Sequence, residues 1–417
     1  MNKIDKANME ALDRINSAEP ELVDIKYAYE VLPGMDKSVI GHAGPPIEWE
    51  NMCGPLKGAV LGAILYEGLA GDLAEAEKLV LNGKIRFVSN HSMGAVGPMT
   101  GMITYSMPLY EVRNKTYGNT AYTTFNEGLG KVLRFGSNGP EVLERLKWFE
   151  HVLAPALKKA IALSGPISLK VIISKALAMG DEMHQRNIAA SLLFAREIMP
   201  YLVEAVDDKA ELRKIIEFIT GNEQLFLNLA MAAGKCTMDP VKNIEHCSIV
   251  TAMSRNGTNF GIQVSALGDT WFEAPVLMPK GLYFAGFSEK DANPDIGDSA
   301  ICETFGIGGV AMGSSPAVVR FVGAKSVQEA LDYSREMEEI SVGKSTNYII
   351  PNMEFQGTAT GIDIRKVVET GIAPVINTGL AHKLPGVGQI GAGIVRAPID
   401  CFVKALYAFA EYEQSLE

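Results

Sequence analysis

Cysteine and long apolar runs are both scarce in this sequence. Its 417 residues include five cysteines, and no two of them form a Cys-x-x-Cys pair. This pattern excludes a zinc ribbon and a disulfide framework, so we expect reduced, mostly buried thiols. The most apolar segment, residues 58–71, is interrupted by Glu67 and is too short to span a bilayer. The polar N-terminus has no apolar signal core, and we therefore predict a cytoplasmic protein without a membrane segment.

Basic residues are also fewer than acidic residues. Lysine and arginine number 38 against 49 acidic residues, which gives a net charge of −11. A nucleic-acid-binding protein needs a basic face, so this balance argues against that class. A small anionic substrate is compatible with it, because single arginines and backbone N–H groups act locally. The 18 methionines and the 47% apolar content favour a homo-oligomer.

Several well-known catalytic motifs are absent. There is no Gly-x-Ser-x-Gly, no His-Glu-x-x-His and no Ser-x-Arg-Thr motif of the ordinary transcarbamoylases. Gly343-Lys344-Ser345 ends like a phosphate-binding P-loop, but Glu338 stands where the leading glycine is required. The chain therefore does not use the machinery of those protein classes.

The length of the chain and the residue composition along it predict an α+β protein of three parts. A chain of 417 residues exceeds the size of one growing core, so two or three domains are expected. Residues 1–139 mix short helices with strand-like runs, residues 140–240 are helical, and residues 241–417 are mixed again and rich in glycine. Strands and helices alternate too irregularly for a doubly wound sheet. We therefore predict two mixed α/β domains flanking a helical domain.

The helical part has clear start and stop signals. Pro140 suits a first helical position, and the apolar residues after it recur every three or four positions. We expect Pro155 to kink or break this helix. Asp208 followed by Glu211 predicts a second helix start, and Gly221-Asn222 predicts its end. The apolar stripe comprises Val142, Leu146, Phe149, Leu153, Leu157 and Ile161.

Elsewhere, short apolar runs predict strands and longer periodic segments predict helices. The predicted strands are 85–88, 109–112, 249–253, 260–264, 282–285 and 318–322, and the predicted helices are 57–70, 327–340 and 399–412.

The glycine-rich C-terminal part has the composition of a binding-site wall. Eight glycines fall within residues 357–393 among single polar groups, and glycine lets the backbone approach a ligand closely. Residues 386–391 match a dinucleotide-binding string, but the strand–turn–helix context is missing. Gly386, Gly388 and Gly391 are instead candidates for a nest of N–H groups around an anion. A tight turn needed only for packing is the alternative.

An acidic stretch at residues 291–303 offers oxygen ligands. Asn293, Asp295, Asp298 and Glu303 have a spacing that suits Mg²⁺ or Ca²⁺, although it is not that of an EF-hand. A divalent metal is therefore a possible cofactor. The alternative is a loop with Asx turns and a helix N-cap at Asp298.

Single polar residues in apolar surroundings are further candidates. His184 interrupts the apolar helical part, and its ordinary pKa suits a general acid or base; a structural helical histidine is the alternative. Arg255, Asn256, Asn259 and Asn377 stand beside or near glycines. Asparagine and arginine side chains suit planar amide, urea-like or carboxylate substrates, whereas ordinary turns are the alternative.

Six strings carry a resemblance to a known family. They are HAGPPIEWENMCGP (42–55), AVGPMTGM (95–102), FNEGLGKVLRFG (125–136), MGDEMHQRN (179–187), NPDIGDSAICETFGIGG (293–309) and the run 361–395. These strings resemble the AllG-type, or YlbE-like, bacterial family, formerly a domain of unknown function, and the resemblance covers about residues 12–406.

The resemblance implies a subunit of oxamate carbamoyltransferase in anaerobic allantoin (purine) breakdown. That enzyme converts oxalurate and phosphate to oxamate and carbamoyl phosphate. The resemblance also implies two companion subunits, one of them FdrA-like and related to acyl-CoA synthetases. It supplies no catalytic residues for this chain. The alternatives are a non-catalytic assembly subunit and a stand-alone enzyme acting on another small amide or acyl substrate.

The chemistry of this reaction distributes roles among the candidates. Anions need cationic or N–H donors, which Arg255, Arg365 and residues 386–393 offer. The leaving nitrogen needs a proton donor, for which His382 and His184 are the candidates. The acids Asp295, Asp298 and Glu303 are expected to orient substrate or hold a metal.

Overall fold

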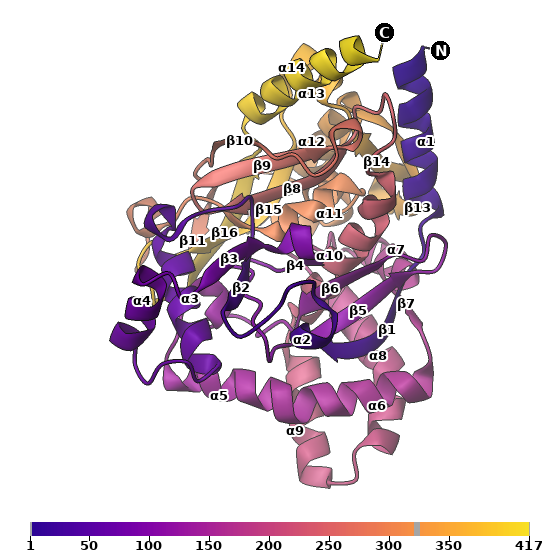
Figure 1. The fold of residues 1–417 in the computed structure, drawn as a ribbon. Coiled ribbons are helices and arrows are strands. Elements are labelled where there is room, and N and C mark those ends of the chain that lie inside the picture. The colour runs from indigo at the N-terminus through magenta and orange to yellow at the C-terminus, as the bar shows by residue number, and fades with distance from the viewer. Residues whose placement is uncertain (1, 321–325, 417) are drawn as a thin grey trace.

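The structure of the chain is a computed structural model that describes residues 2–320 and 326–416. Many helices and several small sheets confirm the α+β class (Figure 1). The helices are α1 (Lys3–Ser17), α2 (Ala28–Val31), α3 (Gly54–Tyr66), α4 (Leu73–Leu81), α5 (Pro140–Trp148), α6 (Ala154–Ser164), α7 (Leu169–Ala178), α8 (Ile188–Ala205), α9 (Lys209–Gly221), α10 (Leu225–Met238), α11 (Ile301–Thr304), α12 (Val327–Glu339), α13 (Ile364–Thr370) and α14 (Ile399–Ser415). The strands are β1 (Pro20–Tyr27), β2 (Val39–His42), β3 (Arg86–Ser89), β4 (Ala95–Val96), β5 (Pro108–Asn114), β6 (Thr120–Thr124), β7 (Ile167–Ser168), β8 (Val250–Asn256), β9 (Asn259–Val264), β10 (Phe272–Pro275), β11 (Lys280–Tyr283), β12 (Ile296–Gly297), β13 (Ser341–Ile350), β14 (Gln356–Ile362), β15 (Val375–Ala381) and β16 (Gln389–Arg396).

The strands form two larger sheets and three smaller ones. A five-stranded sheet has the order β4-β6-β5-β1-β7, and a four-stranded antiparallel sheet has the order β10-β9-β8-β12. A three-stranded sheet, β11-β16-β15, is built on the β15–β16 hairpin. The pairs β13–β14 and β2–β3 complete the set. The glycine-rich segment of residues 386–391 thus lies in the connection from β15 to the antiparallel strand β16 and extends into β16. This strand–turn–strand context differs from the strand–turn–helix context that a dinucleotide-binding site needs.

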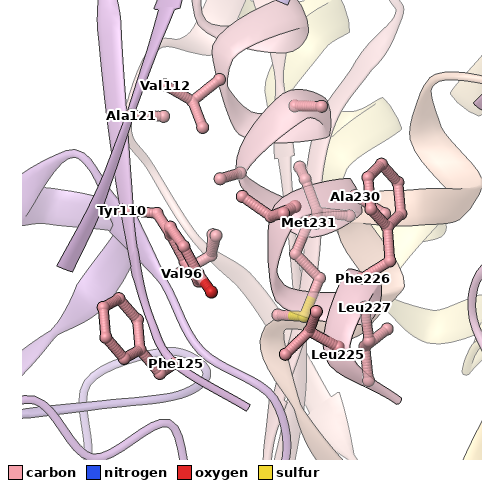
Figure 2. Close-up of a cluster of buried hydrophobic side chains, with 14 of the residues drawn as sticks. Val96, Tyr110, Val112, Ala121, Phe125, Leu225, Phe226, Leu227, Ala230 and Met231 are labelled. Carbon is pink, nitrogen blue, oxygen red and sulfur yellow. The ribbon is translucent and has the colours of Figure 1, made fainter. Parts of the chain in front are cut away.

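Helix α10 is the centre of the molecule. Every one of its residues is buried, as expected for a helix that is apolar on all sides. Figure 2 shows its side chains, among them Leu225 and Met231, beside Val96 and Tyr110 of the five-stranded sheet. A side chain added at Gly234 would lie 2.6 Å from the Phe305 ring, directly after α11. The helix therefore fixes α11 against the core, and α11 carries one of the candidate acids.

The helical part follows the sequence prediction closely. Helix α5 begins at Pro140, and all six residues of the predicted apolar stripe are buried. The predicted interruption at Pro155 takes the form of a π-helical turn at Phe149–Leu153, between α5 and α6, and such turns absorb a local mismatch in the helix. Asp208 caps α9 by accepting from the backbone N–H groups of Ala210 and Glu211.

Most predicted elements outside the helical part are confirmed within a few residues, but one strand is wrong. Residues Pro316–Arg320 form a 3-10 helix in place of the strand predicted at 318–322; positions 321 and 322 lie outside the described residues. The hydrogen bond from Val318 N–H to Ser315 O closes its first turn, directly after the preceding 3-10 helix Gly308–Ser314. A short apolar run does not by itself distinguish a strand from a helical turn.

The interior crosses the predicted boundaries. The largest hydrophobic cluster includes Val60, Leu157 and Phe305, one from each of the three predicted parts, while a second cluster gathers residues of the C-terminal part around Phe402. The division at residues 139 and 240 stays a prediction. All five cysteines are free and four are buried, as predicted. None of the described helices is long and apolar enough to cross a membrane.

Candidate functional site

The polar segment 179–187 is a loop between α7 and α8, so the expectation that His184 is helical is wrong. The buried Glu182 carboxylate folds this loop: its Oε1 accepts from the backbone N–H groups of His184, Gln185 and Arg186 at 3.2, 2.5 and 2.6 Å. Its Oε2 accepts from Asn377 Nδ2 on β15 at 2.8 Å. Burial raises the pKa of Glu182. Glu182 therefore joins the loop to the β15–β16 hairpin.

His184 forms a buried pair with Glu303 of α11. The distance from His184 Nδ1 to Glu303 Oε1 is 2.7 Å, and the two side chains are 3% and 0% exposed. Glu303 Oε1 also accepts from the backbone N–H of Gly309 at 2.9 Å. Gly308 is required here because a Cβ at this position would lie 2.3 Å from Glu303 Oε1. A carboxylate at Nδ1 fixes the ring and leaves Nε2 as the atom that exchanges a proton with a ligand.

The His184 side chain lines a narrow pocket where the three predicted parts meet. The pocket encloses about 30 Å³, enough space for a water-sized group. It shares Leu129, Gln185, Gln224 and Gln389 with a wider hollow of about 160 Å³, so the two adjoin. We call both together the cleft. The narrow part is lined by Pro98, Met99, Leu129, Arg134, Phe135, His184, Gln185, Gln224, Leu227, Ser299, Gly379 and Gln389.

Arg134 is the cationic residue of the narrow pocket, and the sequence analysis missed it. The residue is 7% exposed, and its guanidinium lies 4.8 Å from the centre of the Phe135 ring. Nη2 donates to Gly128 O at 2.7 Å, whereas Nε is buried without a partner. Burial lowers the pKa of Arg134 to about 10, so the side chain stays charged at neutral pH. Its position between glycines in the string 125–136 is the signal that could have identified it.

Arg255, by contrast, is fully paired. Its Nε and Nη2 donate to the Asp295 carboxylate at 2.6 and 2.9 Å. The remaining donors reach Gly297 O at 2.7 Å, Ser299 Oγ at 3.3 Å and Thr378 Oγ1 at 3.2 Å. A guanidinium has five N–H donors, so none is left for a substrate. We call Arg255, Asp295 and Thr378 the arginine cluster.

Asp298 ties the N-terminal part to the C-terminal part. Its carboxylate accepts from Gly44 N–H, Gly97 N–H, Asn90 Nδ2 and Ser254 Oγ at 2.9, 2.9, 3.0 and 2.5 Å. It caps no helix, because these partners come from distant segments, and the predicted N-cap is wrong. Burial raises the pKa of Asp298.

One of the four asparagine candidates contacts Glu182 and Glu303, and the other three make their contacts elsewhere. Asn377 contacts Glu182, as above, and its backbone N–H faces Glu303 Oε1 at 3.4 Å. Asn256 accepts from the N–H groups of Thr258 and Asn259, an Asx turn. Asn259 donates to Glu273 and Asn293 to Pro294 O. Asn377 alone of these four joins the His184–Glu303 pair.

Arg365 and His382 make their contacts elsewhere. Arg365 pairs with Asp363 at 2.7 Å and with Asp5 of α1 at 3.2 Å. His382 Nδ1 accepts from the backbone N–H of Leu384 at 3.0 Å. Among the described residues, no hydrogen bond joins either side chain to His184 or Glu303. Their catalytic roles stay predictions without a supporting contact.

The glycines of residues 386–391 pack tightly against the N-terminal part. Gly386 N–H donates to Gly136 O at 3.0 Å, and a Cβ at Gly388 would lie 2.7 Å from Gly130 O. A Cβ at Gly391 would lie 2.2 Å from Leu282 O within the sheet. These contacts favour packing over an anion nest, and they hold the Arg134 loop against the hairpin. Over residues 2–320 and 326–416, no group of three or more His, Cys, Asp or Glu side chains is arranged to hold a metal ion.

The fold and the cleft define the class of protein. It is an α+β protein with a buried carboxylate–histidine pair whose histidine lines a cleft. Residues 85–299 match the family model "Oxamate carbamoyltransferase subunit AllG". The chain is 48% identical over 408 residues, 97% of either chain, to "Oxamate carbamoyltransferase subunit AllG" of Escherichia coli K12. It is 45% identical to "Uncharacterized protein YahG" of the same strain, over 98% of this chain and 87% of that one.

A solved structure is similar over almost the whole chain. The crystal structure of a conserved protein of unknown function from Enterococcus faecalis V583 matches with a TM-score of 0.96 at 46% identity, over 98% of both chains. Together with the sequence relatives, this shows that the chain belongs to the AllG family, as the resemblance of its long strings implied.

Proposed function

We propose that this protein is a subunit of a carbamoyltransferase that converts oxalurate and phosphate to oxamate and carbamoyl phosphate in anaerobic allantoin breakdown. The 48% identity to a relative named as an oxamate carbamoyltransferase subunit supports the subunit role. In this proposal the chain works in the cytoplasm as a homo-oligomer with two companion subunits, one of them FdrA-like. The cleft beside His184 takes part in the chemistry.

The His184–Glu303 pair, 2.7 Å apart at the wall of the cleft, is the observation that carries the proposal. In the reaction a phosphate oxygen attacks the carbamoyl carbon of oxalurate, and the bond from that carbon to the oxamate nitrogen breaks. The nitrogen needs a proton as it leaves. His184, protonated, donates it, while Glu303 orients the ring and stabilises its positive charge. Such positioned acids contribute roughly 10²–10⁴-fold to a rate.

The test is phosphate-dependent conversion of oxalurate to carbamoyl phosphate, with this chain alone and with its companion subunits. We expect turnover in the complete mixture. No turnover with partners shown to be folded and assembled would contradict the proposal. Unchanged turnover with His184→Asn in the complex would make the chain a non-catalytic assembly subunit.

A further inference from the structure

Two residues that line the narrow pocket each carry a polar atom that is buried without a hydrogen-bond partner. One is Nε of Arg134 and the other is Oε1 of Gln389, and both residues line the pocket. Folded proteins pair nearly all buried polar groups, because an unmet donor or acceptor carries the full free energy of its desolvation. A donor and an acceptor left unmet in one pocket indicate a ligand that supplies both counterparts.

The hydrogen-bonding role of each atom, donor or acceptor, follows from its chemistry and its neighbours. Gln389 Nε2 donates to Gly391 O at 3.1 Å, so the other terminal atom is the amide oxygen, an acceptor. Arg134 already donates to Gly128 O through Nη2 at 2.7 Å, and its Nε–H is a charged donor. The pocket therefore suits an acceptor oxygen at Arg134, best an anionic one because the guanidinium is charged, and an N–H group at Gln389.

We propose that the narrow pocket binds a small carboxylate that also bears an amide or ureido N–H. In this arrangement the carboxylate accepts from Arg134, and the N–H donates to Gln389 Oε1. The small volume of the pocket, about 30 Å³, admits one polar end of such a ligand, and the adjoining hollow of about 160 Å³ receives the rest. The inference rests on the proposed function for its choice of probe, which is oxamate.

The arrangement also orients the ligand toward the acid. His184 lines the same narrow pocket as Arg134 and Gln389. A ligand whose N–H faces Gln389 brings its nitrogen to the wall that carries His184. Arg134 and Gln389 are therefore substrate-binding residues that set specificity for an amide nitrogen.

Calorimetric titration distinguishes the two contacts. The probes are oxamate, oxalate, which has a second carboxylate and no N–H donor, and inorganic phosphate. The full-length chain is titrated alone and then in the complex with its companion subunits. We expect oxamate to bind about ten-fold or more tightly than oxalate, because oxalate brings an acceptor to Gln389 Oε1.

Two variants test the two contacts separately, and a third variant serves as a matched control. Arg134→Gln should weaken oxamate and oxalate alike by about ten-fold or more, since it removes a charge-assisted hydrogen bond. Gln389→Met removes the acceptor at nearly constant volume and should abolish the preference for oxamate over oxalate. Arg145→Gln removes a charge near Glu127 O at 3.4 Å, outside the narrow pocket, and should leave both affinities unchanged.

Several results would overturn the inference. They are equal affinity for oxamate and oxalate in the unmodified protein, a preference that survives Gln389→Met, and unchanged binding by Arg134→Gln. Absence of oxamate binding to both the chain and the complex would overturn it too. So would phosphate that displaces oxamate from Arg134→Gln and from Gln389→Met with the same affinity. If Arg134→Gln does not fold, Arg134→Lys and Gln389→Met still test the two contacts. Binding needs no turnover, so its failure is distinguishable from failure of the carbamoyltransferase assay.

Discussion

The arginine cluster and the cleft are both buried and polar, but they differ in how completely they are paired. Every N–H donor of Arg255 has an acceptor. In the cleft, Arg134 Nε and Gln389 Oε1 have none. Complete networks rigidify a core, whereas unmet groups beside a pocket leave hydrogen-bonding positions for a ligand or water. Residue type alone does not separate the two regions, because an arginine lies at the centre of each.

The largest expected effect comes from breaking the arginine cluster. Arg255→Ala leaves the Asp295 carboxylate buried without its cation, and we expect the free energy of unfolding to fall by about 3–5 kcal/mol. Urea denaturation measures the loss. The double variant Arg255→Met/Asp295→Leu removes both charges and should recover most of it. A loss below about 1 kcal/mol for the single variant would contradict the structural role of this cluster.

Asp298→Asn should have the next largest effect on stability. The amide keeps one acceptor oxygen, and its NH₂ group faces the two partners of the other oxygen. A backbone N–H or an amide NH₂ cannot accept from it, so at least one of the four hydrogen bonds is lost, at about 1–3 kcal/mol for each unmet group. Thermal and urea unfolding should both detect the change, and stability equal to that of the unmodified protein would argue against Asp298 as a structural tie.

Gly308→Ala tests the geometry of the cleft without altering a polar group. The new Cβ would lie 2.3 Å from Glu303 Oε1, which forces the carboxylate away from His184. We expect turnover of the complex to fall by about 10²-fold, the effect of a displacement near 1 Å. Gly371→Ala is the matched control: its φ of +70° resembles the +69° of Gly308, but nothing lies within 4 Å of its added Cβ. Equal losses in the two variants would assign the effect to backbone strain.

The smallest effect concerns pH and Asp181, which caps the start of α8 by accepting from Ala190 N–H. Burial raises the pKa of Asp181 to about 6 from 3.8. A carboxyl with a raised pKa binds its proton more tightly in the folded state, so ionisation lowers stability. Stability should therefore fall, relative to Asp181→Asn, as pH rises from about 4 to about 6, by about 1 kcal/mol per pH unit. Parallel pH profiles of unfolding for the two proteins would contradict the assignment.

The sequence predicts local secondary structure here better than it predicts which side chains contact one another. Pro140 and Asp208 mark helix starts because capping depends on a few adjacent residues. His184 is recognisable as a chemical candidate, but its partner Glu303 lies 119 residues away. Whether an arginine is paired depends on contacts of that kind, so the sequence offered Arg255, which is fully paired, as a candidate and missed Arg134. The glycines at 386–391 correctly predict a close approach of the backbone to another group. That group is the backbone at Gly130 and Gly136, not a ligand.

The measurement that tests the central claim most directly is the turnover of oxalurate by the complete complex carrying His184→Asn, compared with His246→Asn. His246 forms a similar pair with Glu413 at 2.9 Å, at a partly exposed position, and its φ of +64° is one that asparagine tolerates. We predict a fall of about 10²–10⁴-fold for His184→Asn and no change for His246→Asn. Equal turnover in the two variants would contradict a role for the cleft in catalysis.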